Sequence, residues 1–250
     1  MKALLSSVPV DPTHSLSRRH AVAAQIIDGK SLAQQIRDRI ARDCADLLAQ
    51  KGIKPGLAAI LVGDDPASHI YVRNKQKACE AAGIYVDENK LPASTTQAEL
   101  LRLIEKMNAD PKIHGILVQL PLPKHIESKV ILEAVSPQKD ADGFHPYNFG
   151  RLVEGSPVFE ACTPKGVIKM IESTGMAIEG KRAVVLGRSN IVGKPAALML
   201  LQRNATVTVC HSKTRDLPAV CREAEILVVA IGKAKFVTPD MVREGAMVID

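Results

Sequence analysis

The chain has 250 residues, 46% of them hydrophobic and 24% charged, with a formal net charge of +6. This length allows one large domain or two modest ones. Aromatic residues make up only 3%, so an aliphatic core is expected, as in proteins with buried parallel strands. The mild positive charge lacks like-charge runs and interleaved aromatic residues, which argues against a nucleic-acid partner and favours an anionic small molecule.

The cysteines and the apolar segments limit the cellular setting. The chain has five cysteines, and none form a Cys-x-x-Cys pair. An odd number without such pairs favours a reducing compartment and indicates no structural metal site. No apolar stretch approaches the length of a membrane span. We therefore expect a cytoplasmic protein with neither a membrane nor a nucleic acid as partner.

Both ends of the chain differ from the rest. Residues 1–25 contain four serines, two adjacent arginines and a single acid, Asp11. An organellar transit peptide has this composition, and so does a short disordered extension on a cytoplasmic enzyme, which we favour. The last residues, 247–250, are typical of a β-strand. Because domains seldom end inside a buried strand, we expect a truncated chain.

Periodicity predicts the elements in chain order. Apolar residues at helical spacing predict an amphipathic helix over 31–50. In the first part of the chain, strands are then predicted at 57–62, 84–86 and 115–120, and helices at 67–82, 99–108 and 129–135. After Pro164, helices are predicted at 165–173 and 192–203, and strands at 183–186, 206–209, 226–230 and 247–250.

This alternation of strands and helices predicts βαβ units with parallel sheets, and hence an α/β fold. A stretch with several Pro and Gly residues, 146–160, divides the pattern. We therefore expect two α/β domains, residues 26–157 and residues 158–250, preceded by the extension 1–25.

Tyr71 and Lys75 lie four residues apart in the predicted helix 67–82, so their side chains share one face. A phenol beside a desolvated amine can transfer protons near neutral pH. The pair alone is a weak indication. Three unusual segments that follow it add weight: QLPLP at 119–123, KDADGF at 139–144 and GRSNIVG at 187–193.

The segment 187–193 lies between a predicted strand and a predicted helix, like the first turn of a Rossmann domain. Glycine lets the backbone approach a phosphate, and the helix N-terminus offers N–H groups to it. The spacing is not G-x-G-x-x-G, so the alternative is a plain βα turn that needs glycine for its dihedral angles.

The residues after the next strand favour a nucleotide site. A Rossmann domain usually places an acid there for the ribose hydroxyls, whereas this chain has CHSKT at 210–214. With Arg188, these donors suit a 2′-phosphate, which predicts NADP more than NAD. His211 taken alone is more often a structural histidine.

Together these segments resemble the bifunctional methylenetetrahydrofolate dehydrogenase/cyclohydrolase family over residues 26–250. Blocks of the chain carry the resemblance in the same order: IDGK at 27–30, SHIYVRNK at 68–75, GILVQLPLP at 115–123, KDADGFH at 139–145, CTPKG at 162–166 and GRSNIVGKP at 187–195. The resemblance implies NADP-dependent oxidation of methylenetetrahydrofolate to methenyltetrahydrofolate, followed by hydrolysis to formyltetrahydrofolate in the same cleft.

The resemblance also implies an arrangement of the sites. The cleft would lie between the two domains, with folate on the first and NADP on the second. A homodimer would form largely through the second domain, and no metal is implied. The family's later glycine-rich segment and its final helix would lie beyond Asp250.

Carried over to this chain, the resemblance makes Lys75 the main catalytic group, which activates water or receives a proton in the hydrolysis. Gln119 would hydrogen-bond Lys75, and Tyr71 would stack or hydrogen-bond in the folate pocket. Asp142 would accept hydrogen bonds from the pterin amino group and ring nitrogen. Pro121 would shape the cleft wall.

In the second domain the resemblance implies that a small set of residues forms the cofactor site. Gly187, Arg188, Ser189 and Ser212 would hold NADP, with His211 beside them. Asp140 is expected to be a loop carboxylate with its hydrogen bonds satisfied.

Three alternatives remain. Short-chain dehydrogenases also use a Tyr-x-x-x-Lys pair, but their glycine-rich turn precedes the pair and here it follows. A non-catalytic folate- or nucleotide-binding protein, or an inactive fragment, predicts binding without turnover. A member of the family with only the dehydrogenase activity is the third, although Lys75 and Gln119 together favour the bifunctional form.

Overall fold

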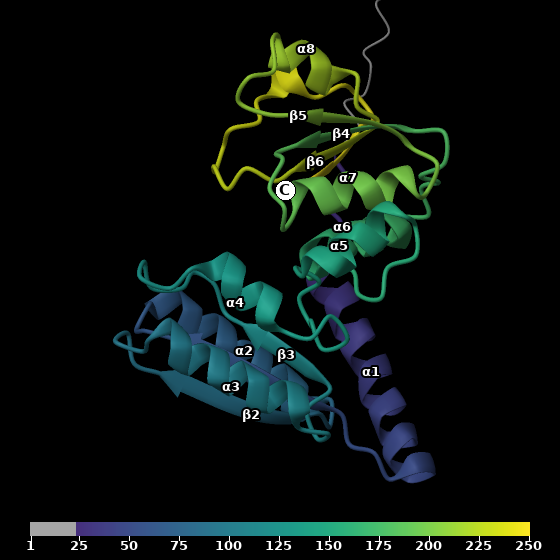
Figure 1. Ribbon diagram of the computed structural model, residues 1–250. Helices are drawn as coiled ribbons and strands as arrows, with labels where there is room; N and C mark the ends of the chain where they lie inside the picture. Colours follow the sequence, from purple (N-terminus) through teal and green to yellow (C-terminus); the bar gives the residue numbers. More distant parts are fainter. Residues whose placement is uncertain (1–23) are drawn as a thin grey trace, which may run out of the picture.

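The computed structural model describes residues 24–250, so all but the last two residues of the predicted extension lie outside the described residues. Two parallel sheets organise the chain (Figure 1). The first half contains α1 Gly29–Lys51, β1 Gly56–Val62, α2 Pro66–Ala81, β2 Tyr85–Leu91, α3 Gln97–Ala109, β3 Gly115–Val118 and α4 Ser128–Ala134. The second contains α5 Pro146–Val153, α6 Cys162–Ser173, β4 Arg182–Leu186, α7 Gly193–Leu201, β5 Thr206–Cys210, α8 Leu217–Arg222, β6 Ile226–Val229, η1 Pro239–Met241 and β7 Met247–Ile249.

The first sheet has the strand order β2-β1-β3. Its central strand β1 is almost wholly buried, as its uninterrupted apolar sequence predicts. Ile60 of β1 is paired with Asn89 of β2 and Val118 of β3, all in parallel. The carboxyl ends of β1 and β3 therefore meet at one edge of the sheet, where the segments that follow them begin.

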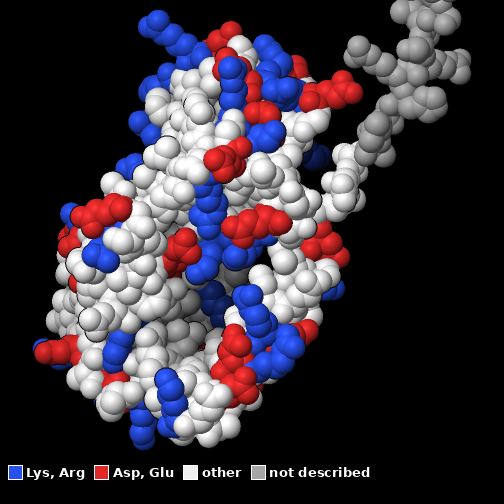
Figure 2. Space-filling view, turned by 90° about the vertical axis from the view of Figure 1, so that its right-hand side faces the viewer, with Lys and Arg blue, Asp and Glu red and all other residues white. Residues whose placement is uncertain are grey.

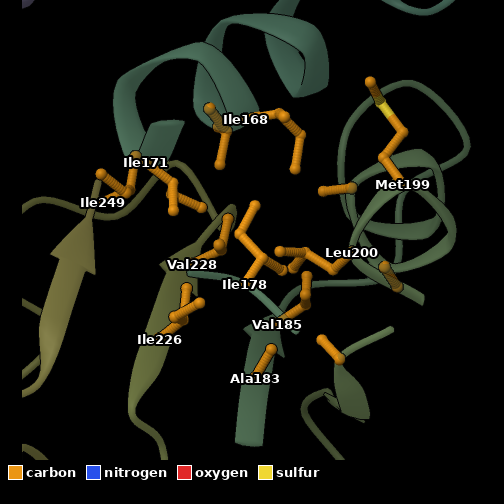
Figure 3. Close-up of a cluster of buried hydrophobic side chains, with 14 of the residues drawn as sticks. Ile168, Ile171, Ile178, Ala183, Val185, Met199, Leu200, Ile226, Val228 and Ile249 are labelled. Atoms are coloured by element: carbon orange, nitrogen blue, oxygen red, sulfur yellow. The ribbon is translucent and has the colours of Figure 1, made fainter. Parts of the chain in front are cut away.

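The second sheet has the order β5-β4-β6-β7, also parallel throughout. Helices α6 and α7 cover one face, and α8 and η1 lie on the other (Figure 1). Burial of this aliphatic core supplies the main driving force for folding of the second half. Figure 3 shows part of it: Ile168, Ile171, Ile178, Ala183, Val185, Met199, Leu200, Ile226, Val228 and Ile249.

The predicted fold class, two α/β units with parallel sheets, is confirmed. Helices α5 and α6 lie between the two sheets, and the start of α1 reaches α6 (Figure 1). Ile27 packs against the core of the second half, although it belongs to the first half by sequence. Figure 2 shows that one face of the molecule is hollowed and that both basic and acidic side chains border the hollow.

Two helices were not predicted. Residues 146–160 were expected only to join the two domains, yet α5 begins within them at Pro146. Proline suits the first helical turn, and His145 caps this helix by accepting from the N–H of Tyr147 at 3.0 Å. Helix α8 was also missed, because its six residues are too few to display a period.

Strand β2 is longer than the predicted 84–86 because it runs to Leu91. It lies at the edge of its sheet; its residues 87–89 are polar and only partly buried, and Lys90 is exposed. An edge strand of this kind lacks the apolar run that reveals a central strand such as β1.

Candidate active site

Helix α2 carries Tyr71 and Lys75 one turn apart, so their side chains lie on the same side of the helix. Asp65 starts the helix by accepting from the N–H of Ser68 at 2.8 Å. Val72, which follows Tyr71 in the chain, is 1% exposed and packs against the sheet. Tyr71 is 62% exposed, whereas Lys75 is half-buried. The aromatic ring therefore lies open to a ligand beside an amine that is partly removed from water.

Gln119 follows β3 and meets Lys75 across the edge of the sheet. Its N–H donates to the carbonyl of Ile60 at 2.9 Å, which continues the pairing of β3 with β1. Its side-chain Nε2 donates to the carbonyl of Leu120 at 2.7 Å. This leaves Oε1 to accept from Lys75 Nζ at 3.4 Å, a long hydrogen bond between residues 44 positions apart.

Asp142 lies on the loop between α4 and α5, close enough to Lys75 for the two charges to interact. Burial raises the pKa of the Asp142 carboxyl; the Lys75 ammonium opposes this shift and the Asp140 charge adds to it. A carboxylate that is partly removed from water in this way is stabilised when a ligand supplies hydrogen-bond donors to it. The three side chains that the motifs singled out in the first half thus come together.

Cys162 was not considered as part of the site from sequence, although its segment 162–166 carried the resemblance. Its Sγ donates to the carbonyl of Ala141 at 3.4 Å, next to Asp142. Burial raises the pKa of the Cys162 thiol, and the Asp142 charge adds to the increase. The start of α6 therefore forms one wall beside the Asp142 carboxylate.

Pro121 comes two residues after Gln119, in a segment that follows β3. The peptide bond between Leu120 and Pro121 is cis, and the Pro121 side chain is exposed. The side chain of Pro123 approaches Gly63, the residue after β1. The proline-containing segment thus lies along the same edge of the sheet as Gln119.

The turn from β4 to α7 is built by two glycines. Gly187 has a φ of +126°, and a Cβ there would lie 2.2 Å from the carbonyl oxygen of Ala230. A Cβ on Gly193 would lie 2.2 Å from the carbonyl oxygen of Gly187. Neither position has room for a side chain, so the chain can fold back on itself only with glycine at both.

Helix α7 begins at this turn with no hydrogen-bonded side-chain cap from its N-cap residue, Val192. Ser189 Oγ accepts instead from the N–H groups of Val192 and Gly193, at 3.2 and 3.3 Å. Arg188 and Ser189 are both exposed. A helix N-terminus with an adjacent hydroxyl and guanidinium is suited to a phosphate.

A second loop lies beside this turn, because the N–H of Gly187 donates to the carbonyl of Cys210 at 2.9 Å. His211 holds that loop: its N–H donates to Thr214 Oγ1 at 2.9 Å and its Nδ1 accepts from the N–H of Lys213 at 3.1 Å. Ser212, between them, is exposed. The two loops carry hydroxyl and cationic donors, which fit the phosphates of a dinucleotide.

Comparison with known proteins identifies the family. Residues 27–142 match the catalytic domain of tetrahydrofolate dehydrogenase/cyclohydrolase, and residues 161–250 match its NAD(P)-binding domain. The chain belongs to the tetrahydrofolate dehydrogenase/cyclohydrolase family. This confirms the resemblance that the motifs indicated.

Relatives in the tetrahydrofolate dehydrogenase/cyclohydrolase family are similar over most of their length. The bifunctional protein FolD of Moorella thermoacetica is 57% identical over 227 residues, which cover 91% of this chain and 81% of the relative. That of Geotalea daltonii is 59% identical over the same shares.

Solved structures of the family agree with the fold. The FolD methylenetetrahydrofolate dehydrogenase/cyclohydrolase of Campylobacter jejuni is 48% identical, with a TM-score of 0.87 over 90% of this chain and 80% of that one. The enzyme of Trypanosoma brucei, solved with NADP and an inhibitor, is 39% identical, with a TM-score of 0.86 over 90% and 77%.

Two further observations concern membrane spans and metal sites. Within residues 24–250, no helix combines the length and the apolar character needed to cross a membrane. In the same range, no group of three or more His, Cys, Asp or Glu side chains is placed to hold a metal ion.

Proposed function

We propose that this protein carries out two consecutive reactions of one-carbon folate metabolism. The first is the NADP-dependent oxidation of methylenetetrahydrofolate to methenyltetrahydrofolate, and the second is the hydrolysis of that product to formyltetrahydrofolate. The observation that carries the proposal is the meeting of Lys75, Gln119 and Asp142 in a chain of this family. Its similarity to bifunctional FolD proteins, one of them solved with NADP, supports both activities and the cofactor.

The second half would hold the cofactor. NADP, when bound, supplies the acceptor for the hydride of the first reaction. Gly187 and Gly193 would let the backbone approach the pyrophosphate, and Ser189 at the start of α7 would donate to it. Arg188 and Ser212 would pair with the 2′-phosphate, since both are exposed on adjacent loops. Their task is alignment, which makes the reaction effectively intramolecular.

The first half would bind the folate and carry the hydrolysis. Asp142 would accept hydrogen bonds from the pterin, and these donors would favour its ionised form. Tyr71 would stack on the ligand, as its exposed ring allows. In its uncharged amine form, Lys75 would take a proton from the attacking water and become the ammonium, and Gln119 Oε1 would hold Nζ in place. Pro121 would form part of the wall.

We propose a homodimer that forms through the second half. Strand β5 is an edge of the four-stranded sheet, and Val209 on it is 39% exposed. An open strand edge with an exposed apolar side chain is a favourable surface for pairing with a second copy. Sedimentation equilibrium tests this: a mass of one chain over the working concentration range would rule the dimer out.

We also propose that the enzyme works in the cytoplasm. All five cysteines are free thiols. Proteins of reducing compartments keep their cysteines in this form.

One absorbance experiment tests the main proposal. Protein is mixed with NADP and methylenetetrahydrofolate, and the methenyl and reduced-nicotinamide bands are followed against a protein-free control. Growth of the nicotinamide band with only transient methenyl absorbance is expected. Stoichiometric accumulation of methenyltetrahydrofolate would indicate a dehydrogenase alone, and no change in either band would indicate a binding protein and contradict the proposal.

A further inference from the structure

We propose that Asp140 is a positioning residue. Its buried carboxylate closes the loop that carries Asp142, and this fixes the position of the Asp142 carboxylate relative to Lys75. Asp140 is 5% exposed. Its hydrogen bonds are satisfied, as the sequence led us to expect, but all of them go to its own loop and to α5. The inference rests on the proposed function insofar as it gives Asp142 a folate-binding role.

The loop is held at both ends. At its beginning, the N–H of Ile116 donates to the carbonyl of Lys139 at 2.6 Å, and the N–H of Ala141 donates to the carbonyl of Ile116 at 3.3 Å. This extends the edge of the first sheet by one bridge. At its end, the Asp140 carboxylate accepts from the N–H of Phe144 at 3.2 Å and from that of His145 at 2.9 Å. Asp142 lies between the two attachments.

Asn148 of α5 supports the carboxylate. It is fully buried, and its Nδ2 donates to Asp140 Oδ2 at 2.8 Å and to the carbonyl of Pro137 at 2.9 Å. Both amide hydrogens are thus used, while Oδ1 is buried without a partner among the described residues. Because an unpaired buried acceptor is unfavourable, the two donated bonds must account for the placement of this side chain.

The same network ties the loop to the second half. Nε2 of Gln202, the residue after α7, donates to the carbonyl of Leu152 at the end of α5, and Leu152 belongs to the core of the second half. At the loop itself, Gly143 has a φ of +70°, and a Cβ there would lie 2.7 Å from the N atom of Ala161. Asp142 is therefore fixed against α5 and α6 as well as against the first sheet.

Asp140 also acts on Asp142 through its charge. The charged groups that act on the Asp142 carboxylate are the Lys75 ammonium from α2 and Asp140 from the same loop, and the Cys162 thiol at the start of α6 lies beside it. The negative charge of Asp140 raises the pKa of Asp142. A neutral residue at position 140 should therefore lower that pKa, in the same direction as any loss of burial around Asp142.

Asp140→Asn tests the inference in the full chain with both substrates. Its amide presents N–H groups where the loop needs an acceptor, so the loop should relax. We expect the KM for the folate substrate to rise about 10- to 100-fold in both reactions, the order that a displacement near 1 Å produces. We expect kcat to change far less, NADP affinity to stay unchanged, and the acid limb of the kcat/KM profile to move to lower pH.

Glu225→Gln is the matched control. Glu225 also holds a chain segment, accepting from the N–H of Arg182 and from Lys181 Nζ, each at 3.0 Å, at the start of β4 and far along the chain from Asp142. Its folate KM and its pH profile should match those of the wild type. The same values in Asp140→Asn would overturn the inference.

Failure of the wild-type protein to turn over its substrates and failure of the variant to fold have different consequences. A wild-type protein that turns over neither substrate would overturn the proposed function, and the folate role of Asp142 with it. If Asp140→Asn does not fold, Asn148→Ala decides, because it keeps the carboxylate and both backbone donors. A smaller rise in folate KM, by about 3- to 10-fold, is then expected for the loss of one hydrogen bond, and an unchanged KM would overturn the inference.

Discussion

The two halves of the site are built in different ways. In the first half, Lys75, Gln119 and Asp142 come from a helix, a strand end and a loop, and their side-chain atoms would provide the proposed chemistry. In the second half, Gly187 and Gly193 act through the absence of side chains, and the backbone forms the turn. The first site depends on distant segments meeting, whereas the second is encoded within a few residues.

This difference leads to a separation that experiments can test. Hydrolysis of methenyltetrahydrofolate consumes no cofactor, so it should not depend on the β4–α7 turn of the second half. The oxidation should need both halves. A substitution in the first half should therefore impair hydrolysis, and one in the turn of the second half should spare it.

The largest effect is expected for Lys75→Met. Loss of a positioned proton-transfer group should lower the hydrolysis of supplied methenyltetrahydrofolate by about 10²- to 10⁴-fold. Folate affinity should be largely kept, because Asp142 and Tyr71 remain. Lys77→Met is the control, since Lys77 is exposed on the same helix. Unchanged hydrolysis in Lys75→Met would refute the role given to this lysine.

The second half is tested by Gly193→Ala. The added Cβ would meet the Gly187 carbonyl oxygen at 2.2 Å, so the turn must open and move the groups that we propose bind the phosphates. The oxidation rate at fixed NADP should fall by about 100-fold, as for a displacement near 1 Å. Hydrolysis should stay within about twofold. Gly150→Ala, where a Cβ meets nothing within 4 Å, is the matched control.

If Gly193→Ala abolished hydrolysis as strongly as oxidation while the protein stayed folded, the two halves would not be separable. Circular dichroism and the melting temperature of the same preparation establish folding. That outcome would remove the basis of the comparison.

Arg188→Ala examines cofactor choice within the second half. Loss of a charge-assisted hydrogen bond of about 1.5–3 kcal/mol should raise the KM for NADP about 10- to 150-fold. The KM for NAD should hardly change, because NAD has no 2′-phosphate. Arg182→Ala, with an exposed arginine at the opposite end of β4, should leave both constants unchanged. An equal loss for both cofactors would place Arg188 elsewhere than at the 2′-phosphate.

The same contrast explains what could be read from the sequence. The turn at 187–193 and the shared face of Tyr71 and Lys75 follow from local spacing, so the pattern predicted them directly. The buried strands β1, β4 and β6 were predicted because continuous apolar runs mark central parallel strands. The meeting of Lys75 with Gln119 could not be derived from spacing and was expected only through the family resemblance.

Helix α5 shows why the rest was hidden. Its proline and glycine residues suggested a connection between domains, because local propensity favours turns there. Its stability comes from contacts that the sequence does not display: Asn148 on Asp140, and Leu152 in the core of the second half. Tertiary packing overrode propensity, and the expected division at 157/158 stays a prediction.

The smallest expected effect is on the stability of the folded protein. Most substitutions lower stability, whereas replacement of Asp142 should raise it. Because the pKa of Asp142 is raised in the folded state, the folded protein binds more protons than the unfolded chain over the pH interval above the ordinary value of about 3.9. Stability therefore falls as the pH rises through that interval, and the loss persists at neutral pH. Asp142→Asn removes this ionisation.

Asp142→Asn should thus raise the melting temperature of the ligand-free protein at pH 7, and the gain should shrink as the pH falls toward 4. Folate binding should weaken at the same time, because the amide no longer accepts two hydrogen bonds from the pterin. Differential scanning calorimetry across this pH range measures the first effect, and titration with a folate ligand measures the second. A variant that melts lower than the wild type at pH 7 would mean that the attraction of Asp142 to Lys75 outweighs its desolvation. In that case the carboxylate would stabilise the first half as well as prepare it for its ligand.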